Sequence, residues 1–565
     1  MLNMMNANEV GKRTRENWKA GLTVALISVP LSIALSIASG AGPVPGLITG
    51  VWATLIAGFF GGSHFNIIGA AGALTTVLFA STLSAPAGLG AAVLPFVAMA
   101  TGLIILLVWF FALDRYLYYI PSSVMYGFAA GVAILIAASQ LFDASGLSSL
   151  SRTGTLIGDV EKFIAHHQEA HTVSLIVFVA FLAGILIFKR YIKSIPAVIP
   201  AAIVGILVGY LDSTYNLGLV TLSDKFGSFS ASLYVPVSWS SLSIFSQHAA
   251  MLWIFETAGI VALIAVLETL ITAKLGDKLT RTESSSSREL LGLSLANLGS
   301  GVMGGLPATG VFIRTGANIK AGATHRLSSI LTAIFTAVIM LIALPFFSYL
   351  PMTVIAAMLV NTALGLLEIH KFKEFYEREV ESFVVAIIVA LITIFHDAGL
   401  GVTIGAVFAL MLFARKIARG RFDIIWNYAS GDKDEERSER HIALPKNGKA
   451  IRVATYSIAG NLGYIDAERH RLNLKRLAEA PRVENVIIRL RDLFSIDIEG
   501  VDALSDSVRE LQSRGKGVYF SSVSVSILDE LLLTPTFDEL NRSHRFNRKT
   551  ADILKDLGLH QEQPQ

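Results

Sequence analysis

The chain has 565 residues, of which 53% are hydrophobic and only 16% charged, and its mean hydropathy of +0.59 is far above that of a soluble domain. Its apolar residues come in runs of about membrane length, which excludes an ordinary soluble protein and predicts many crossings of the bilayer. The net charge of +3 argues against nucleic acid as a partner, and the absence of cysteine excludes disulfides, thiolate metal sites and a cysteine nucleophile.

Residues 1–19 are basic and precede a long apolar run that lacks a small-residue cleavage site. We therefore expect a cytoplasmic N-terminal segment followed by a retained first helix, not a signal peptide. Fourteen apolar segments are predicted in all, most of them close to the ~20 residues that span a bilayer. They begin near Ala20, Leu47, Ala71, Ala91, Ile120, Thr172, Ile195, Met251, Glu289, Val311, Leu327, Met352, Ser382 and Gly401.

The basic residues support this count, because cytoplasmic links between membrane helices are rich in Lys and Arg. Starting inside, the predicted inner links contain Arg115, Lys189, Arg190, Lys193, Lys274, Lys278, Arg281, Arg288, Lys320, Arg326, Lys371, Lys373, Arg378, Arg415, Lys416, Arg419 and Arg421. The two long predicted outer loops, 143–171 and 212–250, contain only Arg152, Lys162 and Lys225. This bias predicts an even number of segments with both termini in the cytoplasm.

Two of the fourteen segments are short and glycine-interrupted, one at 71–84 and the other at 310–320. They are the third segment of the first seven and the third of the second seven. Non-helical backbone at membrane depth persists only where it is buried in protein or lines a cavity. The matched pair predicts a secondary transporter built from two inverted repeats, with its substrate between the breaks. The alternative is that these glycines only allow close helix packing.

The character of the sequence changes after residue 421. A charged stretch is predicted to form a linker over 422–443, and an α/β pattern follows over 444–565. Strands are expected at 451–460, 486–490 and 517–522, and helices at 467–479, 500–514 and 526–533. The predicted fold class is an all-α polytopic membrane domain over 20–421 with a 7+7 inverted repeat and two interrupted half-helices, followed by a small cytoplasmic α/β domain.

Several motifs point to one family. The runs at 20–35, 43–47, 59–63, 268–272 and 297–318, together with the C-terminal module, resemble the sulfate permease (SulP) family in the expected order from about residue 15 to 555. The resemblance implies a plasma-membrane (bacterial inner-membrane) transporter of small inorganic anions such as sulfate or bicarbonate, usually a homodimer. It also implies core and gate domains that move in an elevator-like way, and a C-terminal STAS domain.

In that family the anion lies between the N-terminal ends of the third and tenth helices, where free N–H groups and the helix dipole attract negative charge. The resemblance places the substrate-binding positions at Ala70, Ala71, Gly72, Gly310, Val311, Phe312 and Arg314. Most of these side chains are apolar, so we expect the backbone to do most of the recognition. Arg314 is expected either to add a fixed positive charge or to have a structural role.

Glu268, deep in the eighth segment, matches the family's coupling position. A carboxyl buried in the membrane is expensive, so a function is the default expectation. It can carry a proton, whereas sodium needs several converging oxygens, for which Glu268, Thr272 and Gly310 are the candidates. Phe312 stands where sodium-dependent relatives place a hydroxyl ligand, which favours proton coupling. A sodium-coupled bicarbonate importer is the alternative.

Two positions depart from the family pattern. Leu31 stands where many sulfate-transporting relatives have a polar residue, which favours bicarbonate. Ile498 follows the STAS motif residue Asp497, so regulation by phosphorylation is not expected at that site. A membrane anion sensor that signals through the STAS domain is a further alternative. No nucleotide- or zinc-hydrolysis motif is present, so we expect neither an enzyme nor a bound cofactor.

Overall fold

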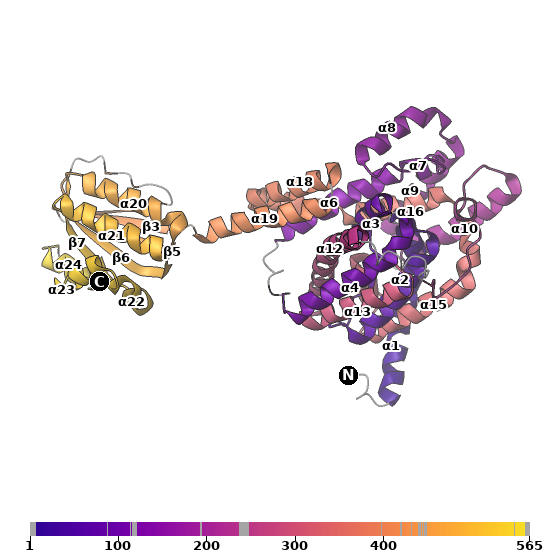
Figure 1. Cartoon of the computed structure of the whole chain (residues 1–565), viewed down its shortest axis with the longest axis horizontal. Helices are drawn as coiled ribbons and strands as arrows, with labels where there is room; N and C mark the ends of the chain where they lie inside the picture. Colours follow the sequence, from indigo (N-terminus) through magenta and orange to yellow (C-terminus); the bar gives the residue numbers. More distant parts are fainter. Residues whose placement is uncertain are drawn as a thin grey trace. The chain divides into compact units, whose positions relative to one another are not determined.

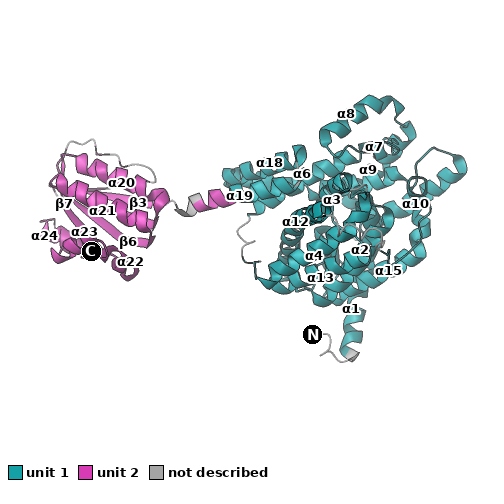
Figure 2. Ribbon diagram, viewed as in Figure 1, with its two compact units in different colours: residues 1–409 teal, residues 410–565 magenta. Residues whose placement is uncertain are grey.

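The computed structural model describes residues 7–559 except 87–88, 114, 116–120, 193–194, 237–247, 397, 419–420, 431, 439–441, 443, 446–448 and 547. The chain divides into two compact units, residues 1–409 and 410–565, shown in different colours in Figure 2. Of the residues used to predict the topology, Ile120, Lys193 and Arg419 lie outside the described part.

Unit 1 is helical (Figure 1). In the described chain, nine helices are long and apolar enough to cross a membrane. They contain α1 (Ala7–Ala38), α2 (Pro43–Phe60), α4 (Leu94–Phe110), α6 (Ser122–Ser139), α9 (Thr172–Tyr191), α10 (Val198–Tyr215), α12 (His248–Thr280), α15 (Leu327–Phe347) and α16 (Met352–Leu366). The other helices at predicted segments are α3 (Gly72–Ser84), α13 (Ser286–Val302), α14 (Phe312–Lys320), α18 (Val380–Phe395) and α19 (Ala398–Ala418). Each of the fourteen predicted segments therefore falls on a helix.

The helices of unit 1 pack closely through small residues. A Cβ added at Gly58 of α2 would lie 2.8 Å from Ile330 Cγ1 of α15, and one at Gly131 of α6 would lie 2.6 Å from Thr393 Cβ of α18. Close backbone approach is what helix pairs need where the surrounding medium is as apolar as their side chains. Glycine packing therefore occurs in addition to the two breaks predicted from the sequence, so the two explanations are not exclusive.

Short helices cover one end of unit 1, opposite the first turn of α1 (Figure 1). The chain forms them in the two long links that were predicted to be outer loops. They are α7 (Leu141–Ala144), α8 (Leu156–His166) and α11 (Leu222–Phe226). We call this end of unit 1 the α8 end.

Unit 2 contains one five-stranded sheet in the order β4-β3-β5-β6-β7. Strands β5 (Ile451–Leu462), β6 (Val483–Ile496) and β7 (Gly517–Ser521) are parallel, as expected for strands joined through helices. The connecting helices are α20 (Tyr464–Glu479), α21 (Ile498–Ser513) and α22 (Val525–Leu532), followed by α23 (Pro535–Arg542) and α24 (Thr550–Asp556). The predicted α/β pattern is thus present, with each predicted strand and helix lying on an observed one.

The stretch predicted to be a linker is different in the structure. Within the predicted linker of residues 422–443, the described residues include most of β3 (Arg421–Tyr428) and all of β4 (Lys433–Ser438), an antiparallel pair, and β3 also pairs with β5. Residues 431, 439–441 and 443 of that stretch lie outside the described part. Phe422, Ile424 and Trp426 alternate into the core of unit 2 and are at most 1% exposed. The charged residues that suggested a linker belong to the edge strand β4, where charge blocks further strand pairing.

Candidate functional site

A two-stranded antiparallel pair joins the two glycine-interrupted regions of unit 1. Strand β1 (Ile68–Gly69) pairs with β2 (Thr309–Gly310), with Ile68 opposite Gly310 and Gly69 opposite Thr309. The Val311 amide extends the pair by donating to the Ile67 carbonyl oxygen at 2.8 Å. Residues 240 positions apart in the sequence are thus held side by side inside the membrane unit.

Each strand leads directly into a short helix. Ala71, with extended backbone, precedes α3, and Val311, also extended, precedes α14. Because the two strands are antiparallel, α3 and α14 leave the strand pair at its opposite ends. The first N–H groups of a helix have no acceptor within it and carry its positive dipole end. Each end of the strand pair is therefore followed by an anion-attracting helix N-terminus.

Side chains from α12 and α13 hold β2 in this position. The Gly310 amide donates to Thr269 Oγ1 at 2.8 Å, and Thr309 Oγ1 donates to the Ala265 carbonyl at 3.0 Å. Asn297 bonds both backbone groups of Ala308, accepting from its amide at 2.8 Å and donating to its carbonyl at 2.9 Å. These bonds satisfy buried backbone groups that a broken helix would otherwise leave unpaired.

A second polar cluster holds the region before β1. Glu289, at the start of α13, is buried and accepts from the amides of Gly62 and Ser63 and from Asn66 Nδ2, each at 2.7 Å. Asn66 Oδ1 in turn accepts from Thr315 Oγ1 of α14 at 3.0 Å. The carboxylate is therefore used for structure, because its hydrogen bonds tie α13 and both half-helix regions together.

Arg314 is completely buried one turn into α14. Within the described chain its only polar contact is Nη2 donating to Ser32 Oγ at 3.0 Å, and its Nε and Nη1 have no partner. A Cβ added at Gly69 would lie 2.7 Å from Arg314 Nη1, so the guanidinium lies against β1. A buried cation with unused donors needs a negative partner, and the cluster contains no carboxylate bonded to it.

Glu268 and Thr272 lie on α12, next to β2. Glu268 Oε2 is buried without a hydrogen-bond partner, and the Thr309 side chain is beside the carboxyl. Thr272 is 1% exposed, and its hydroxyl is 3.4 Å from the Gly310 carbonyl oxygen. Three oxygen-bearing groups that the sequence predicted as coupling ligands are thus close to the same strand.

Residues of α6 and α16 face the helix ends. A Cβ added at Gly72 would lie 3.4 Å from both Ile136 Cδ1 of α6 and Leu366 Cδ1 of α16. One added at Gly365 of α16 would lie 3.6 Å from Ile313 Cδ1 of α14. Apolar side chains of α6 and α16 therefore border the start of α3, and α16 approaches α14 closely at Gly365.

The structure gathers the predicted site residues around β1 and β2. Ala70, Ala71 and Gly72 precede or begin α3, and Gly310, Val311, Phe312 and Arg314 precede or begin α14. All are buried except Phe312, which is 37% exposed. Several supporting polar residues were not predicted: Ser32, Asn66, Thr269, Glu289, Asn297 and Thr309. Their signal in the sequence was weak, because single polar residues in apolar helices do not reveal their partners.

Comparisons with known proteins show the family of the chain. The model of the sulfate permease family matches residues 15–389, and that of the STAS domain matches residues 443–552. The chain belongs to the sulfate permease family. It is accordingly a multi-pass membrane protein of a transporter family, followed by a STAS domain.

Members of the family with different named substrates resemble the chain. The bicarbonate transporter BicA of Synechocystis sp. is 24% identical over 559 residues, which cover 96% of this chain and 95% of that protein. The chloroplastic sulfate transporter 4.1 of Arabidopsis thaliana is 24% identical over 515 residues, 88% of this chain and 73% of that one. Identity at this level does not separate the substrates.

Solved structures of relatives share the fold. The overall structure of SLC26A9 matches with a TM-score of 0.78 at 15% identity, covering 99% of this chain and 91% of that one. The transmembrane domain of a cyanobacterial BicA matches with a TM-score of 0.60 at 24% identity. This match covers 70% of this chain and 97% of that one. The match to SLC26A9 extends over almost the whole chain, so the folds of both units are found in a solved structure.

Proposed function

We propose that this sulfate permease family member is a secondary active transporter of a small oxyanion of the sulfate or bicarbonate class, coupled to protons. The observation that carries the proposal is the β1–β2 pair, which has a half-helix N-terminus after each strand and the Arg314 guanidinium, with two unpartnered nitrogens, against Gly69. Backbone donors recognise charge and approximate size, so the arrangement suits small anions in general. The named substrates of the relatives are of that kind.

Proton coupling is assigned to Glu268. Its unpartnered Oε2 lies in the membrane unit beside the strand that leads to the anion site, where a carboxyl can carry a proton together with the anion. Sodium is the second candidate, because the Thr272 hydroxyl and the Gly310 carbonyl oxygen converge next to Glu268. Phe312 contributes no hydroxyl to that set, which favours the proton.

The proposed transport cycle moves the site between the two sides of the membrane. The helices that carry β1 and β2 would move as a body, elevator-like, past the apolar side chains of α6 and α16. Following the bias of the basic residues, both termini would lie in the cytoplasm and the α8 end outside. We expect a homodimer in the plasma membrane.

Uptake by the purified protein in liposomes tests the function. Radiolabelled sulfate or bicarbonate is added outside the liposomes. We expect uptake that depends on an inward proton gradient and persists without sodium. Uptake that survives collapse of the pH gradient but disappears without sodium would establish the second candidate. Absence of uptake for the whole panel of sulfate, bicarbonate and dicarboxylates would refute transport of this class.

Glu268→Gln tests the coupling residue. The amide keeps the shape of the side chain but cannot carry a proton, so we expect proton-driven uptake to fall at least tenfold, while exchange of labelled for unlabelled anion persists. Glu256→Gln is the matched control, because Glu256 lies on the same helix with an exposed side chain. Unchanged proton-driven accumulation in the Glu268 variant contradicts the assignment.

A further inference from the structure

A polar cavity lies at the α8 end of unit 1. It has a volume of about 340 Å³ and is bordered by the ends of α1, α3 and α6 and by the loops around α7 and α11. Phe79 in its wall is seven residues along α3 from Gly72, which is about 10 Å along the helix axis. The cavity is therefore separate from the site at β1 and β2.

Arg152 supplies a cation to this cavity. Its Nη2 donates to the Ala38 carbonyl oxygen at 2.9 Å, and its Cζ lies 3.4 Å from the centre of the Phe79 ring. These are its contacts with the described chain, so most of the five N–H donors of the guanidinium are not used. Burial lowers the pKa of Arg152 to about 10, despite the nearby Asp143 and Asp159 carboxylates, and a guanidinium with that pKa is still charged at neutral pH.

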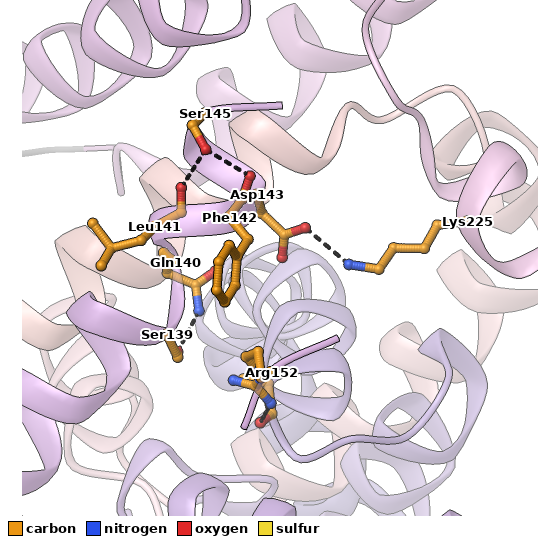
Figure 3. A network of polar contacts seen from close by, with 9 residues as sticks. Ser139, Gln140, Leu141, Phe142, Asp143, Ser145, Arg152 and Lys225 are labelled. Atoms are coloured by element: carbon orange, nitrogen blue, oxygen red, sulfur yellow. Dashed lines mark hydrogen bonds and ion pairs between the residues drawn. The ribbon is translucent and has the colours of Figure 1, made fainter. Parts of the chain in front are cut away.

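The two carboxylates near Arg152 already have partners. Asp143 forms an ion pair with Lys225 at 2.8 Å, and Figure 3 shows these two side chains pointing toward each other with Arg152 apart from them. Asp159 accepts from the Thr153 amide at 2.6 Å and from Thr153 Oγ1 at 2.8 Å. Neither carboxylate makes a direct ion pair with Arg152, so among the described residues the guanidinium has no bonded counter-ion, and most of its donors are unused.

Neutral donors complete the lining. Ser148 is 7% exposed, and its buried hydroxyl has no hydrogen-bond partner in the described chain. Ser149, Ser151 and Gln140 also line the cavity, and the Gln140 amide donates to Ser139 Oγ at 2.7 Å. A buried hydroxyl left unpaired costs free energy unless a ligand or water bonds to it.

We propose that this cavity is a second binding site for a small oxyanion, held by the Arg152 guanidinium and the Ser148 hydroxyl. The ligand class rests on the proposed function. The planar guanidinium fork matches two oxygens of one oxyanion, and the hydroxyl supplies a neutral donor. A site at the α8 end would hold the anion before it reaches the helix ends, raising its local concentration where the transport site opens.

Equilibrium binding to the full-length protein in lipid nanodiscs tests the second site, with radiolabelled sulfate and, in parallel, labelled bicarbonate as probes. We expect two classes of site in the wild type. Arg152→Gln should weaken one class at least tenfold, Arg314→Gln should weaken the other, and the double variant should lose both. Arg152→Lys keeps the charge without the fork and should bind with intermediate affinity.

Lys373→Gln is the matched control, because it removes a positive charge from an exposed side chain of unit 1 that does not line the cavity. It should leave both classes of site unchanged. A single class of site that Arg152→Gln does not alter overturns the second site and leaves the proposed function intact. No binding of either anion to wild type overturns both. Melting curves show whether a variant loses binding because it misfolds. If Arg152→Gln misfolds, the affinity of Arg152→Lys for the anion tests the second site instead.

Discussion

Arg314 is positioned by packing against β1 and by a single hydroxyl, not by a carboxylate partner. A side chain held in this way keeps its charge available for a ligand. Glu289 shows the opposite use of a buried charge, since all its contacts are backbone and amide donors of the protein itself. Both side chains are buried, so burial does not distinguish a structural charge from one proposed to bind a ligand. The two differ in the number of hydrogen-bonding atoms that have no partner in the described chain.

Arg314→Gln removes the positive charge and should raise the KM for anion uptake by about 10- to 150-fold, since a hydrogen bond to a charged group contributes about 1.5–3 kcal/mol. Arg314→Lys keeps the charge but loses the planar guanidinium fork, so its KM should lie between those of the wild type and Arg314→Gln. Lys320→Gln, an exposed residue in the last turn of the same half-helix, is the control. Initial uptake rates over a range of anion concentrations measure the effect, and an unchanged KM in Arg314→Gln contradicts it.

His470 in unit 2 makes the stability of that unit depend on pH. It is 1% exposed and 2.7 Å from the Tyr456 hydroxyl, and burial, aided by Arg469, lowers its pKa from 6.5 to about 3. The folded state therefore keeps it neutral at pH values where an unfolded histidine binds a proton. The contribution of neutral His470 to the free energy of unfolding is therefore fully present above about pH 6.5, and it is lost progressively as the pH falls toward 3.

Urea unfolding of a fragment of residues 421–559 should show this dependence. Between pH 7.5 and pH 5.0 we expect the His470 contribution to lower the free energy of unfolding by about 2 kcal/mol. His470→Gln removes the titrating group, so the difference between the two pH values should shrink by that amount. An equal pH dependence in both fragments would mean that other groups are responsible.

At the scale of elements, the β1–β2 pair is what turns two interrupted helices into one site. The pair is only two residues long on each strand, so it depends on the side chains of α12 and α13 that bond to it. Its glycines allow other groups to approach the backbone closely.

Gly69→Ala tests this close approach. The added Cβ would be 2.7 Å from Arg314 Nη1, the flexible end of a side chain, so the fold should persist while the guanidinium is displaced. We expect anion uptake to fall at least tenfold with little change in melting temperature. Gly316→Ala is the control, because a Cβ there would meet nothing within 4 Å. Equal activity of the two variants would show that the guanidinium position is not critical.

At the scale of the whole molecule, the two units differ in what stabilises them. Unit 1 depends on helix pairs in an apolar medium, whereas unit 2 has a hydrophobic core around its sheet, to which β3 contributes. The boundary of the soluble unit therefore has to include β3, although its sequence lies next to the membrane segments.

A fragment of residues 421–559 should fold as a soluble domain, and one of residues 444–559 should not. The shorter fragment lacks Phe422, Ile424 and Trp426 and leaves β5 as an unpaired edge. Loss of even one large core side chain costs about 3–5 kcal/mol, comparable to the stability of a small domain. Circular dichroism during urea titration distinguishes them, and cooperative unfolding of the shorter fragment with equal midpoint would refute the role of β3.

Local patterns in the sequence determined the class of the molecule. The lengths of the apolar runs predicted the fourteen segments, the glycine interruptions predicted the positions of both half-helices, and alternation of short strands and helices predicted most of unit 2. Each of these signals lies within about 20 residues, so no knowledge of the rest of the chain was needed.

Only the tertiary structure decided which distant residues meet. The pairing of Ile68 with Gly310, the bonds of Glu289 to the loop before β1, and the unpaired donors of Arg314 and Arg152 all depend on contacts across more than 100 residues. The sequence of a charged stretch does not show that it pairs with distant strands, which is why residues 422–443, with β4 and most of β3, were predicted to be a linker. Hydrogen-bond satisfaction is a property of the folded chain, so it separates structural charges from those available to a ligand.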